Sequence, residues 1–270
     1  MRPASIADFP RSQTLTAGLE VVARIDSTNA ELVRREQAAP QPHFTTLVTL
    51  HQTAGKGRLD RRWSAAPDTS VAISVVIRPK VPVEKWGLVT LLGGLAARAA
   101  VAEQLPRPTA ALKWPNDVLV GGRKIAGVLA QLVPETGAVI LGVGINTAMT
   151  ETELPVPTAT SVIIERDYED ERTPRQIADS VVTEFLAALA GLVVRFEFAR
   201  GDLDRAGLRD ELEQACVTLG TVVDVELPEG ETLRGRAIGI GADGALLIAS
   251  DTGEPPAAIL AGDVTHVRSA

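Results

Sequence analysis

A glycine-rich segment at 52–63 combines cationic side chains with a flexible backbone. It follows an apolar run at 46–50 and contains Gly55 and Gly57. Glycines let the backbone bend and approach a ligand, and lysine and arginine donate charge-assisted hydrogen bonds to carboxylate and phosphate oxygens. Its four cations are Lys56, Arg58, Arg61 and Arg62. The segment predicts an anion-binding loop, with a solvated surface turn as the alternative.

A second polar cluster stands where a predicted strand at 19–25 meets a predicted helix that ends near residue 37. The chain reads Asp26-Ser27-Thr28-Asn29, and Glu31 follows Thr28 at the spacing of a capping box. Hydroxyl, amide and free backbone N–H groups at such a junction can hold a small polar ligand. The alternative is a plain helix cap, which is the commoner use of these residues.

A third cluster surrounds Lys113, which precedes a turn at Pro115-Asn116-Asp117 and stands between Leu112 and Trp114. A lysine in an apolar segment is costly unless it meets an anion in a cleft, although an edge-strand lysine in water is the alternative. Lys124, taken by itself, is predicted to be solvated.

Glycine pairs of the dinucleotide type are incomplete in this chain. Gly55-x-Gly57 and Gly142-x-Gly144 lack the third glycine, and no P-loop motif occurs. The pair at 142 and 144 is read either as close strand packing or as ligand contact.

The hydrophobic pattern predicts an α+β fold with a mixed sheet flanked by helices. Strands are expected at 46–50, 69–77, 110–114, 118–120, 124–133 and 138–145, and helices at 83–105, 174–196 and 202–214. The short loops after residue 110 require antiparallel pairing. The stretch at 149–160 is long enough to be a lid. From 219 onward, four or five short strands with a turn at 228–230 predict a small β-barrel.

Composition limits the function classes. A net charge of −7 over 270 residues argues against bulk nucleic-acid binding. The single cysteine, Cys216, excludes an internal disulfide and fits a reducing cytoplasm, and His43, His51 and His266 lack zinc-like spacing. No secretory signal pattern is present. The longest apolar run considered, 86–101, is interrupted by polar and glycine residues and predicts a buried helix rather than a membrane span.

Five motifs, in order, resemble those of the biotin protein ligases. They are Ile25-Asp26-Ser27-Thr28-Asn29, the segment 52–58 with Arg61 and Trp63, Lys113-Trp114-Pro115-Asn116-Asp117, the run 124–129, and Gly142-Val143-Gly144-Ile145-Asn146. The resemblance spans about residues 19–268. It implies a catalytic domain similar to class II aminoacyl-tRNA synthetases and a small SH3-like barrel. The expected division is an N-terminal tail at 1–18, a catalytic domain at 19–216 and the barrel at 217–270.

The resemblance implies a two-step ligase that uses ATP and biotin. Biotin carboxylate attacks the α-phosphorus of ATP, pyrophosphate leaves, and a lysine of a biotin carboxyl carrier protein then displaces AMP from biotinyl-5′-AMP. Two anions must meet in such a site, so cations have to offset their repulsion. Mg²⁺ is expected to arrive with ATP, because no carboxylate cluster predicts a protein-built metal site.

Residue roles follow from the same resemblance. Lys113 is expected to bridge carboxylate and phosphate, with Arg58 as a second catalytic cation and Asp117 as an acidic helper. The residues expected around biotin are Ser27, Thr28, Asn29, Gln52, Lys56, Gly57, Arg58, Lys113 and Gly127. Those expected around the nucleotide are Arg58, Arg61, Trp63, Asn116, Lys124 and Asn146. The glycine-rich cationic segment is expected to fold over the intermediate and shield it from water.

Two departures from the family pattern qualify the resemblance. Lys56 replaces the first arginine of the usual Gly-Arg-Gly-Arg loop, which keeps the charge but loses the planar fork. About 18 residues precede the first strand, too few for a winged helix-turn-helix. The expectation is therefore a cytoplasmic ligase, monomeric or homodimeric, without a nucleic-acid or membrane partner. A lipoate ligase and a non-catalytic biotin-binding module remain as alternatives, although the Lys-Trp-Pro-Asn-Asp run and the cationic loop favour biotin.

Overall fold

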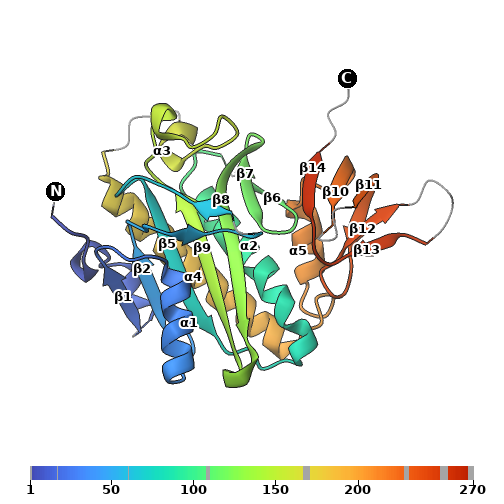
Figure 1. Ribbon diagram of the computed structural model, residues 1–270, viewed down its shortest axis with the longest axis horizontal. Helices are drawn as coiled ribbons and strands as arrows, with labels where there is room; N and C mark the ends of the chain where they lie inside the picture. The colour runs from blue at the N-terminus through green and yellow to red at the C-terminus, as the bar shows by residue number, and fades with distance from the viewer. Residues whose placement is uncertain are drawn as a thin grey trace.

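The computed structural model describes residues 2–16, 18–59, 61–107, 110–166, 171–227, 231–249 and 255–266. The turn predicted at 228–230 lies outside this set, as does Asp60 in the cationic segment. Figure 1 shows a central sheet with helices on both faces and a smaller sheet beside it.

The central sheet has seven strands in the order β1-β2-β5-β9-β8-β7-β6. These are β1 (Leu19–Val22), β2 (Thr46–Thr49), β5 (Ser70–Ile77), β6 (Ala110–Lys113), β7 (Asp117–Val120), β8 (Arg123–Val133) and β9 (Ala138–Asn146). β1 and β2 are parallel and the other neighbours are antiparallel, which confirms the predicted mixed sheet. Every residue of β5 is buried because helices cover both of its faces.

The helices form two layers around this sheet. They are α1 (Thr28–Ala38), α2 (Val89–Ala102), α3 (Val162–Glu165), α4 (Pro174–Phe198) and α5 (Leu208–Ala215). α1 lies on one face, and α2 and α4 lie on the other (Figure 1). Gly93 lets α2 approach the sheet closely, since a Cβ there would lie 2.8 Å from Leu141 Cδ1. The short 3-10 turns are η1 (Ile6–Asp8), η2 (Ser12–Thr14), η3 (Val83–Leu88), η4 (Pro134–Thr136) and η5 (Glu151–Glu153).

Two predicted helices differ in extent from those observed. The helix expected at 83–105 begins with the 3-10 turn η3 and becomes α-helical at Val89. The helix expected at 202–214 begins only at Leu208, because Asp202 Oδ1 accepts from the N–H groups of Asp204 and Arg205 and so holds a turn.

The long helix α4 corrects the expectation that 86–101 is the longest apolar run of the chain. Among the described residues it is the one helix whose length and composition would suffice to cross a membrane, and 61% of its most apolar window is buried. It packs against α2 and β5, and this internal burial accounts for its hydropathy. The helix at 174–196 was predicted to be strongly amphipathic, but α4 is only weakly so, because apolar residues occupy most of its circumference.

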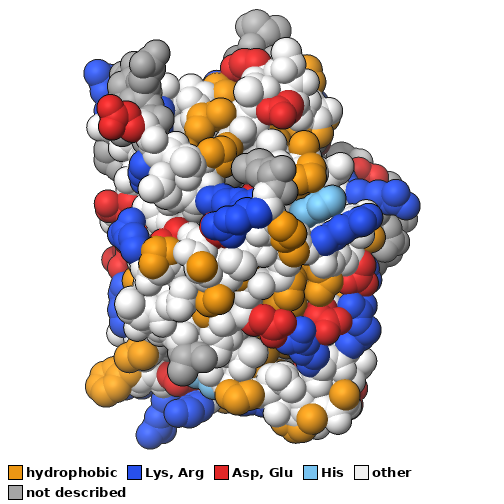
Figure 2. Space-filling model, turned by 90° about the vertical axis from the view of Figure 1, so that its left-hand side faces the viewer, with side chains coloured by type: hydrophobic (Ala, Val, Ile, Leu, Met, Phe, Trp, Pro, Cys, Tyr) orange, Lys and Arg blue, Asp and Glu red, His pale blue; other side chains and the backbone are white. Residues whose placement is uncertain are grey.

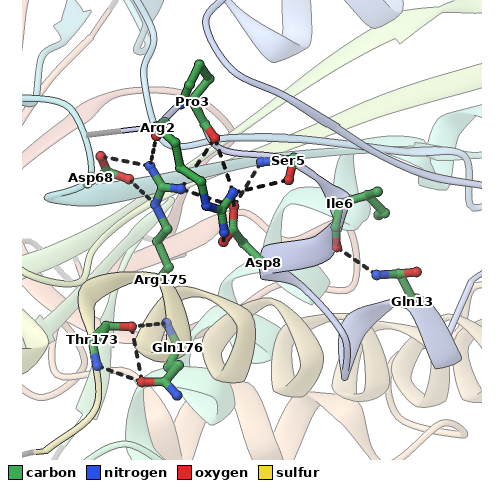
Figure 3. Close-up of polar contacts among 10 residues, drawn as sticks. All are labelled: Arg2, Pro3, Ser5, Ile6, Asp8, Gln13, Asp68, Thr173, Arg175 and Gln176. Atoms are coloured by element: carbon green, nitrogen blue, oxygen red, sulfur yellow. Dashed lines mark hydrogen bonds and ion pairs between the residues drawn. The ribbon is translucent and has the colours of Figure 1, made fainter.

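The N-terminal segment is anchored to α4 through buried ion pairs. Arg175 donates to Asp68 Oδ1 at 3.0 Å and to Asp8 Oδ2 at 3.2 Å, as Figure 3 shows. Burial alone would raise the pKa of Asp8, but the Ser5 N–H, Arg2 and Arg175 outweigh it and hold that pKa below its usual value. These contacts join residues 2–8 to the loop that leads into β5.

The C-terminal sheet is fully antiparallel, in the order β13-β12-β11-β10-β14. Its strands are β10 (Val222–Glu226), β11 (Thr232–Ile240), β12 (Leu246–Ala249), β13 (Ala257–Ile259) and β14 (Asp263–His266), which confirms the four or five short strands expected. Trp114 ties it to the central sheet, since its N–H donates to Thr218 Oγ1 at 3.1 Å and its Nε1 to Gly244 O at 3.0 Å.

Candidate active site

A cavity of about 150 Å³ lies between the N-terminus of α1, the middle of the central sheet and the cationic segment. All but two of the predicted site residues line it. Those present are Ser27, Thr28, Asn29, Gln52, Lys56, Gly57, Arg58, Arg61, Trp63, Asn116, Asp117, Lys124 and Gly127. The exceptions are Lys113 and Asn146.

The floor of the cavity is a buried network of hydroxyl and amide groups. The Thr28 N–H donates to Gln52 Oε1 at 2.8 Å, and Asn29 Nδ2 donates to Leu129 O at 3.0 Å. Ser74 Oγ lies 2.7 Å from both Thr28 Oγ1 and Asn29 Oδ1 and is fully buried. Ser74 was missed in the sequence, where the one available signal was a hydroxyl inside the apolar strand at 69–77.

The helix that presents this floor is capped differently from the expectation. Ser27 is the N-cap, and its Oγ accepts from the Ala30 N–H at 3.4 Å. Glu31 does not close a capping box, because Arg34 at 2.7 Å and Arg35 at 2.8 Å hold its carboxylate. The predicted Thr28–Glu31 capping box was wrong, because the cap is Ser27, one residue earlier. Thr28 therefore faces the cavity.

Two glycines on β9 let side chains lie directly on the sheet. A Cβ at Gly142 would lie 2.3 Å from Asn29 Oδ1, and one at Gly144 would lie 2.5 Å from Trp63 Cε2. Any larger residue would push these pocket side chains away. The Trp63 Nε1 is buried without a hydrogen-bond partner among the described residues, so its N–H is available to a ligand.

The cationic segment forms a hairpin over the cavity. Its two short strands, β3 (Gly55–Lys56) and β4 (Arg62–Trp63), pair with each other and with no strand of the other sheets among the described residues. At its tip the Gly57 N–H donates to Arg61 O at 2.7 Å. Arg58 turns inward and donates to Asn116 Oδ1 at 3.3 Å, and burial lowers its pKa. The segment is thus positioned to bring cations to a bound anion.

Lys124 lines the cavity, where the resemblance to the family placed it, although taken by itself it was expected to be solvated. Its Nζ lies 2.6 Å from Asp117 Oδ1, and its side chain is 39% exposed. The pairing of β7 with β8 shifts register between Val118 and Leu119, which sets the direction of Lys124. The predicted lid at 149–160 fixes its backbone, because Thr158 O accepts from the Lys124 N–H at 2.7 Å.

Lys113 does not line this cavity. It lies on β6 opposite Asp117, where it borders a small recess beside α5 and the C-terminal sheet. Its charge acts instead on β14: burial first, and then Lys113, lowers the pKa of His266. The expectation that Lys113 contacts the ligands directly receives no support from this placement.

Asn146 is also outside the cavity. It is buried and donates through Nδ2 to Thr160 O at 2.9 Å, so it holds the end of the 149–160 segment. No group of three His, Cys, Asp or Glu side chains suited to a metal ion occurs in the described part of the chain. A protein-built metal centre therefore has no ligand set among those residues.

Comparison with known proteins identifies the family. The sequence profile of the Biotin/lipoate A/B protein ligase family matches residues 21–146, and that of the biotin protein ligase C terminal domain matches residues 218–267. The biotin–[acetyl-CoA-carboxylase] ligase of Mycobacterium tuberculosis is 35% identical over 99% of this chain and 98% of its own length. A bifunctional ligase/repressor of Bacillus subtilis is 28% identical over 78% of this chain and 63% of its own.

Solved structures show the same relationship. The biotin protein ligase of Aquifex aeolicus in complex with biotin and ATP superposes with a TM-score of 0.71 at 25% identity, covering 94% of this chain and 100% of that one. A Leishmania major biotin protein ligase in complex with biotinyl-5-AMP shares the fold alone, with a TM-score of 0.54 at 19% identity, covering 94% of this chain and 100% of that one. The chain therefore belongs to the biotin protein ligase family.

Proposed function

We propose that this chain activates biotin with ATP to give biotinyl-5′-AMP and pyrophosphate, and then transfers biotin to a lysine of a carboxylase carrier protein. The observation that carries the proposal is one cavity with two unlike ends. One end is the buried hydroxyl and amide floor, and the other is the cationic hairpin with Lys124. A ring rich in hydrogen-bonding groups fits the first, and reacting anions fit the second.

The hydrogen-bonding floor supports recognition of the biotin ring. Its atoms already satisfy one another, so they are held in place before a ligand arrives. Ser27, Thr28 and Asn29 are 2%, 3% and 4% exposed, which keeps bulk water from competing with a bound ring. A cyclic urea offers both donors and a carbonyl acceptor, and this floor carries groups of both kinds.

The cations support the chemistry of the first step. Biotin carboxylate must approach an α-phosphate, and two like charges 4 Å apart repel by about 4 kcal/mol at an effective dielectric constant near 20. Lys56, Arg58, Arg61 and Lys124 all line the cavity and can offset that repulsion. Negative charge then builds on the phosphate oxygens, and the same donors stabilise this transition state more strongly than the ground state.

We assign the bridge between carboxylate and phosphate to Lys124 in place of Lys113. Lys124 lines the cavity and Lys113 does not. Asp117 is then a positioning residue, since its Oδ1 holds the Lys124 ammonium at 2.6 Å. The nucleotide role of Asn146 becomes indirect, through the segment that ends at Thr160.

The acceptor and the metal are also part of the proposal. The Mycobacterium tuberculosis relative is named for acetyl-CoA carboxylase, and this supports a biotin carboxyl carrier protein as acceptor. Mg²⁺ would enter with the triphosphate, because among the described residues the cavity lining contributes only the carboxylates of Asp117 and Asp263, and both are paired with cations. It would supply further charge neutralisation at the phosphates.

The remaining expectations concern organisation and surroundings. We propose a catalytic domain at 19–216 and a barrel at 217–270, with the change near Cys216, which bridges to Leu112. The segment 1–18, expected as a tail, is anchored on α4 through Asp8 and Ser12. The net charge of −7 supports the absence of a nucleic-acid partner. On the face in Figure 2, lysine and arginine side chains lie in separate groups with acidic ones among them. A single buried cysteine supports a reducing, cytoplasmic setting.

Isotope exchange between ATP and pyrophosphate tests the proposal directly. Purified protein is expected to exchange label only when biotin is present, because the first step is reversible and needs no acceptor. Exchange that depends on lipoate in place of biotin would identify a lipoate ligase. Binding of biotin without any exchange would identify a non-catalytic module and contradict the proposal.

A further inference from the structure

A carboxylate from the C-terminal sheet lies among the cations of the cavity. Asp263, the first residue of β14, lines the cavity together with Gly262. It forms an ion pair with Arg61 at the tip of the hairpin. Next to it, Gly262 O accepts a long hydrogen bond from Arg58 Nη2 at 3.5 Å. Two arginines of the cationic segment are thus held by one turn of the other sheet.

Electrostatics show that this carboxylate is charged. Burial alone would raise the pKa of Asp263, but Arg61, Lys113 and Arg58 together hold it below its usual range. In return, the hydrogen bond that Arg61 donates to Asp263 raises the pKa of Arg61. The Asp263 side chain is 34% exposed, so it is open to the solvent and to an incoming ligand. An anion-binding site is therefore occupied in part by an internal anion.

A triphosphate competes directly with such a group. Its oxygens need the same guanidinium donors, and its charge repels the Asp263 carboxylate across a short distance. The ion pair with Arg61 is exposed enough to break at low cost. We propose that Asp263 is a latch that holds the cationic hairpin against the C-terminal sheet until the nucleotide triphosphate displaces it. The inference rests on the proposed function, because it takes ATP as the ligand of this cavity.

The latch makes the C-terminal sheet a regulator of nucleotide binding. While Asp263 holds Arg61, the hairpin is ordered but is partly neutralised. When the triphosphate takes over Arg61, the hairpin is released from β14 and can follow the ligand. This differs from a direct contact between the C-terminal sheet and ATP, because removal of the carboxylate should strengthen binding and not weaken it.

Nucleotide affinity of Asp263→Asn tests the latch. The change keeps the shape and removes the charge, so the Kd for ATP is expected to fall about fivefold or more at low salt, in line with typical coupling between competing interactions. Tripolyphosphate should show the same gain, and uncharged adenosine should show none. The gain should shrink as salt rises, because the groups are partly exposed. Asp263→Ser serves as a second variant with the same expectation.

Asp224→Asn is the matched control. Asp224 lies on β10 of the same sheet, where its Oδ1 pairs with Arg234 Nε at 3.8 Å, and it does not line the cavity. Its ATP affinity is expected to stay unchanged. A second readout needs no ligand: trypsin should cleave ligand-free Asp263→Asn faster than wild type within 56–62, because the hairpin has lost its hold on β14.

The outcomes separate the latch from the function. Unchanged or weaker ATP binding in Asp263→Asn, with wild-type cleavage of the hairpin, overturns the latch. If wild-type protein shows no biotin-dependent exchange at all, the proposed function fails, whatever Asp263 does. Equal gains in Asp263→Asn and Asp224→Asn would reduce the effect to net charge and would also overturn the latch.

Discussion

Replacement of Lys124 by alanine is the sharpest test of the catalytic assignment. The change removes the ammonium that lies 2.6 Å from Asp117 Oδ1 and lines the cavity beside Gly127. It leaves the backbone pairing of residue 124 with Thr158 and Thr160 in place. The expected defect is therefore in the chemical step and not in the fold.

Lys124→Ala should have a small effect on stability and a large effect on kcat. The Lys124–Asp117 pair is partly exposed, at 39% and 21%, so its contribution to stability is about 0–1 kcal/mol and the Tm should move by only a few degrees. A donor aimed at charge that develops in the transition state is worth about 10²–10³ in kcat. Because four other cations, Lys56, Arg58, Arg61 and Arg62, also line this cavity, we expect a loss near the lower end of that range.

The assay is biotin-dependent exchange between ATP and pyrophosphate, with Lys113→Ala as the matched control. Lys113→Ala is expected to lose less than about tenfold, since it removes a charge that acts on β14 from outside the cavity. The reverse result, a severe loss in Lys113→Ala and a mild one in Lys124→Ala, would refute the reasoning. A shared loss with lowered Tm would indicate a folding defect and would also count against it.

Three further predictions test the floor, the hairpin and the N-terminal anchor. Gly144→Ala should raise the KM for ATP about tenfold, because its Cβ would lie 2.5 Å from Trp63 Cε2 and displace the indole. Arg58→Gly should release biotinyl-5′-AMP early, which is measured as biotin label on bystander lysines; full retention would contradict a shielding hairpin. Arg175→Met should cost about 3 kcal/mol in urea unfolding, because Asp68 loses its ion pair and the buried Asp8 keeps only Arg2 of its two arginines. The pKa of Asp8 is lowered from 3.8, so its ionised form stabilises the fold above that pH, and this stabilisation is lost as pH falls through the folded pKa. Arg175→Met should therefore reduce the fall in the free energy of unfolding between these two pH values.

Much of the fold was accessible because local pattern and tertiary structure agree. The alternation at 69–77 predicted β5, and short loops after residue 110 forced the antiparallel order of β6 to β9. Residue chemistry singled out the two stretches that line opposite ends of the cavity, the cationic loop and the Ser-Thr-Asn junction, and the resemblance to biotin protein ligases then favoured ligand contact over a surface turn and a helix cap. Residue type was sufficient to single them out because each stretch is contiguous.

The direction of a single side chain was not accessible. Lys113 ends the four-residue strand β6, whereas Lys124 is the second residue of the eleven-residue strand β8, where the register shift between Val118 and Leu119 sets its direction. Asp263 was missed for a different reason. It approaches Arg61 from 202 residues away, and no local pattern marks such a contact. Ser74 was hidden inside a strand whose apolar residues dominate the pattern.

The floor of the cavity and the cationic hairpin have separate tasks: the floor recognises the ring of the ligand, and the hairpin serves the reacting groups. The floor is built on α1, β5 and β9, where burial and mutual hydrogen bonds keep each group in place before the ligand arrives. The cations stand mainly on a two-stranded hairpin whose described residues pair with no other strand and reach β14 through exposed contacts. A rigid floor can discriminate one ring from another, because any mismatch leaves buried polar groups unpaired. A hairpin held by weak contacts can instead change partners as charge moves from carboxylate to phosphate, and this freedom is what a two-step ligation requires.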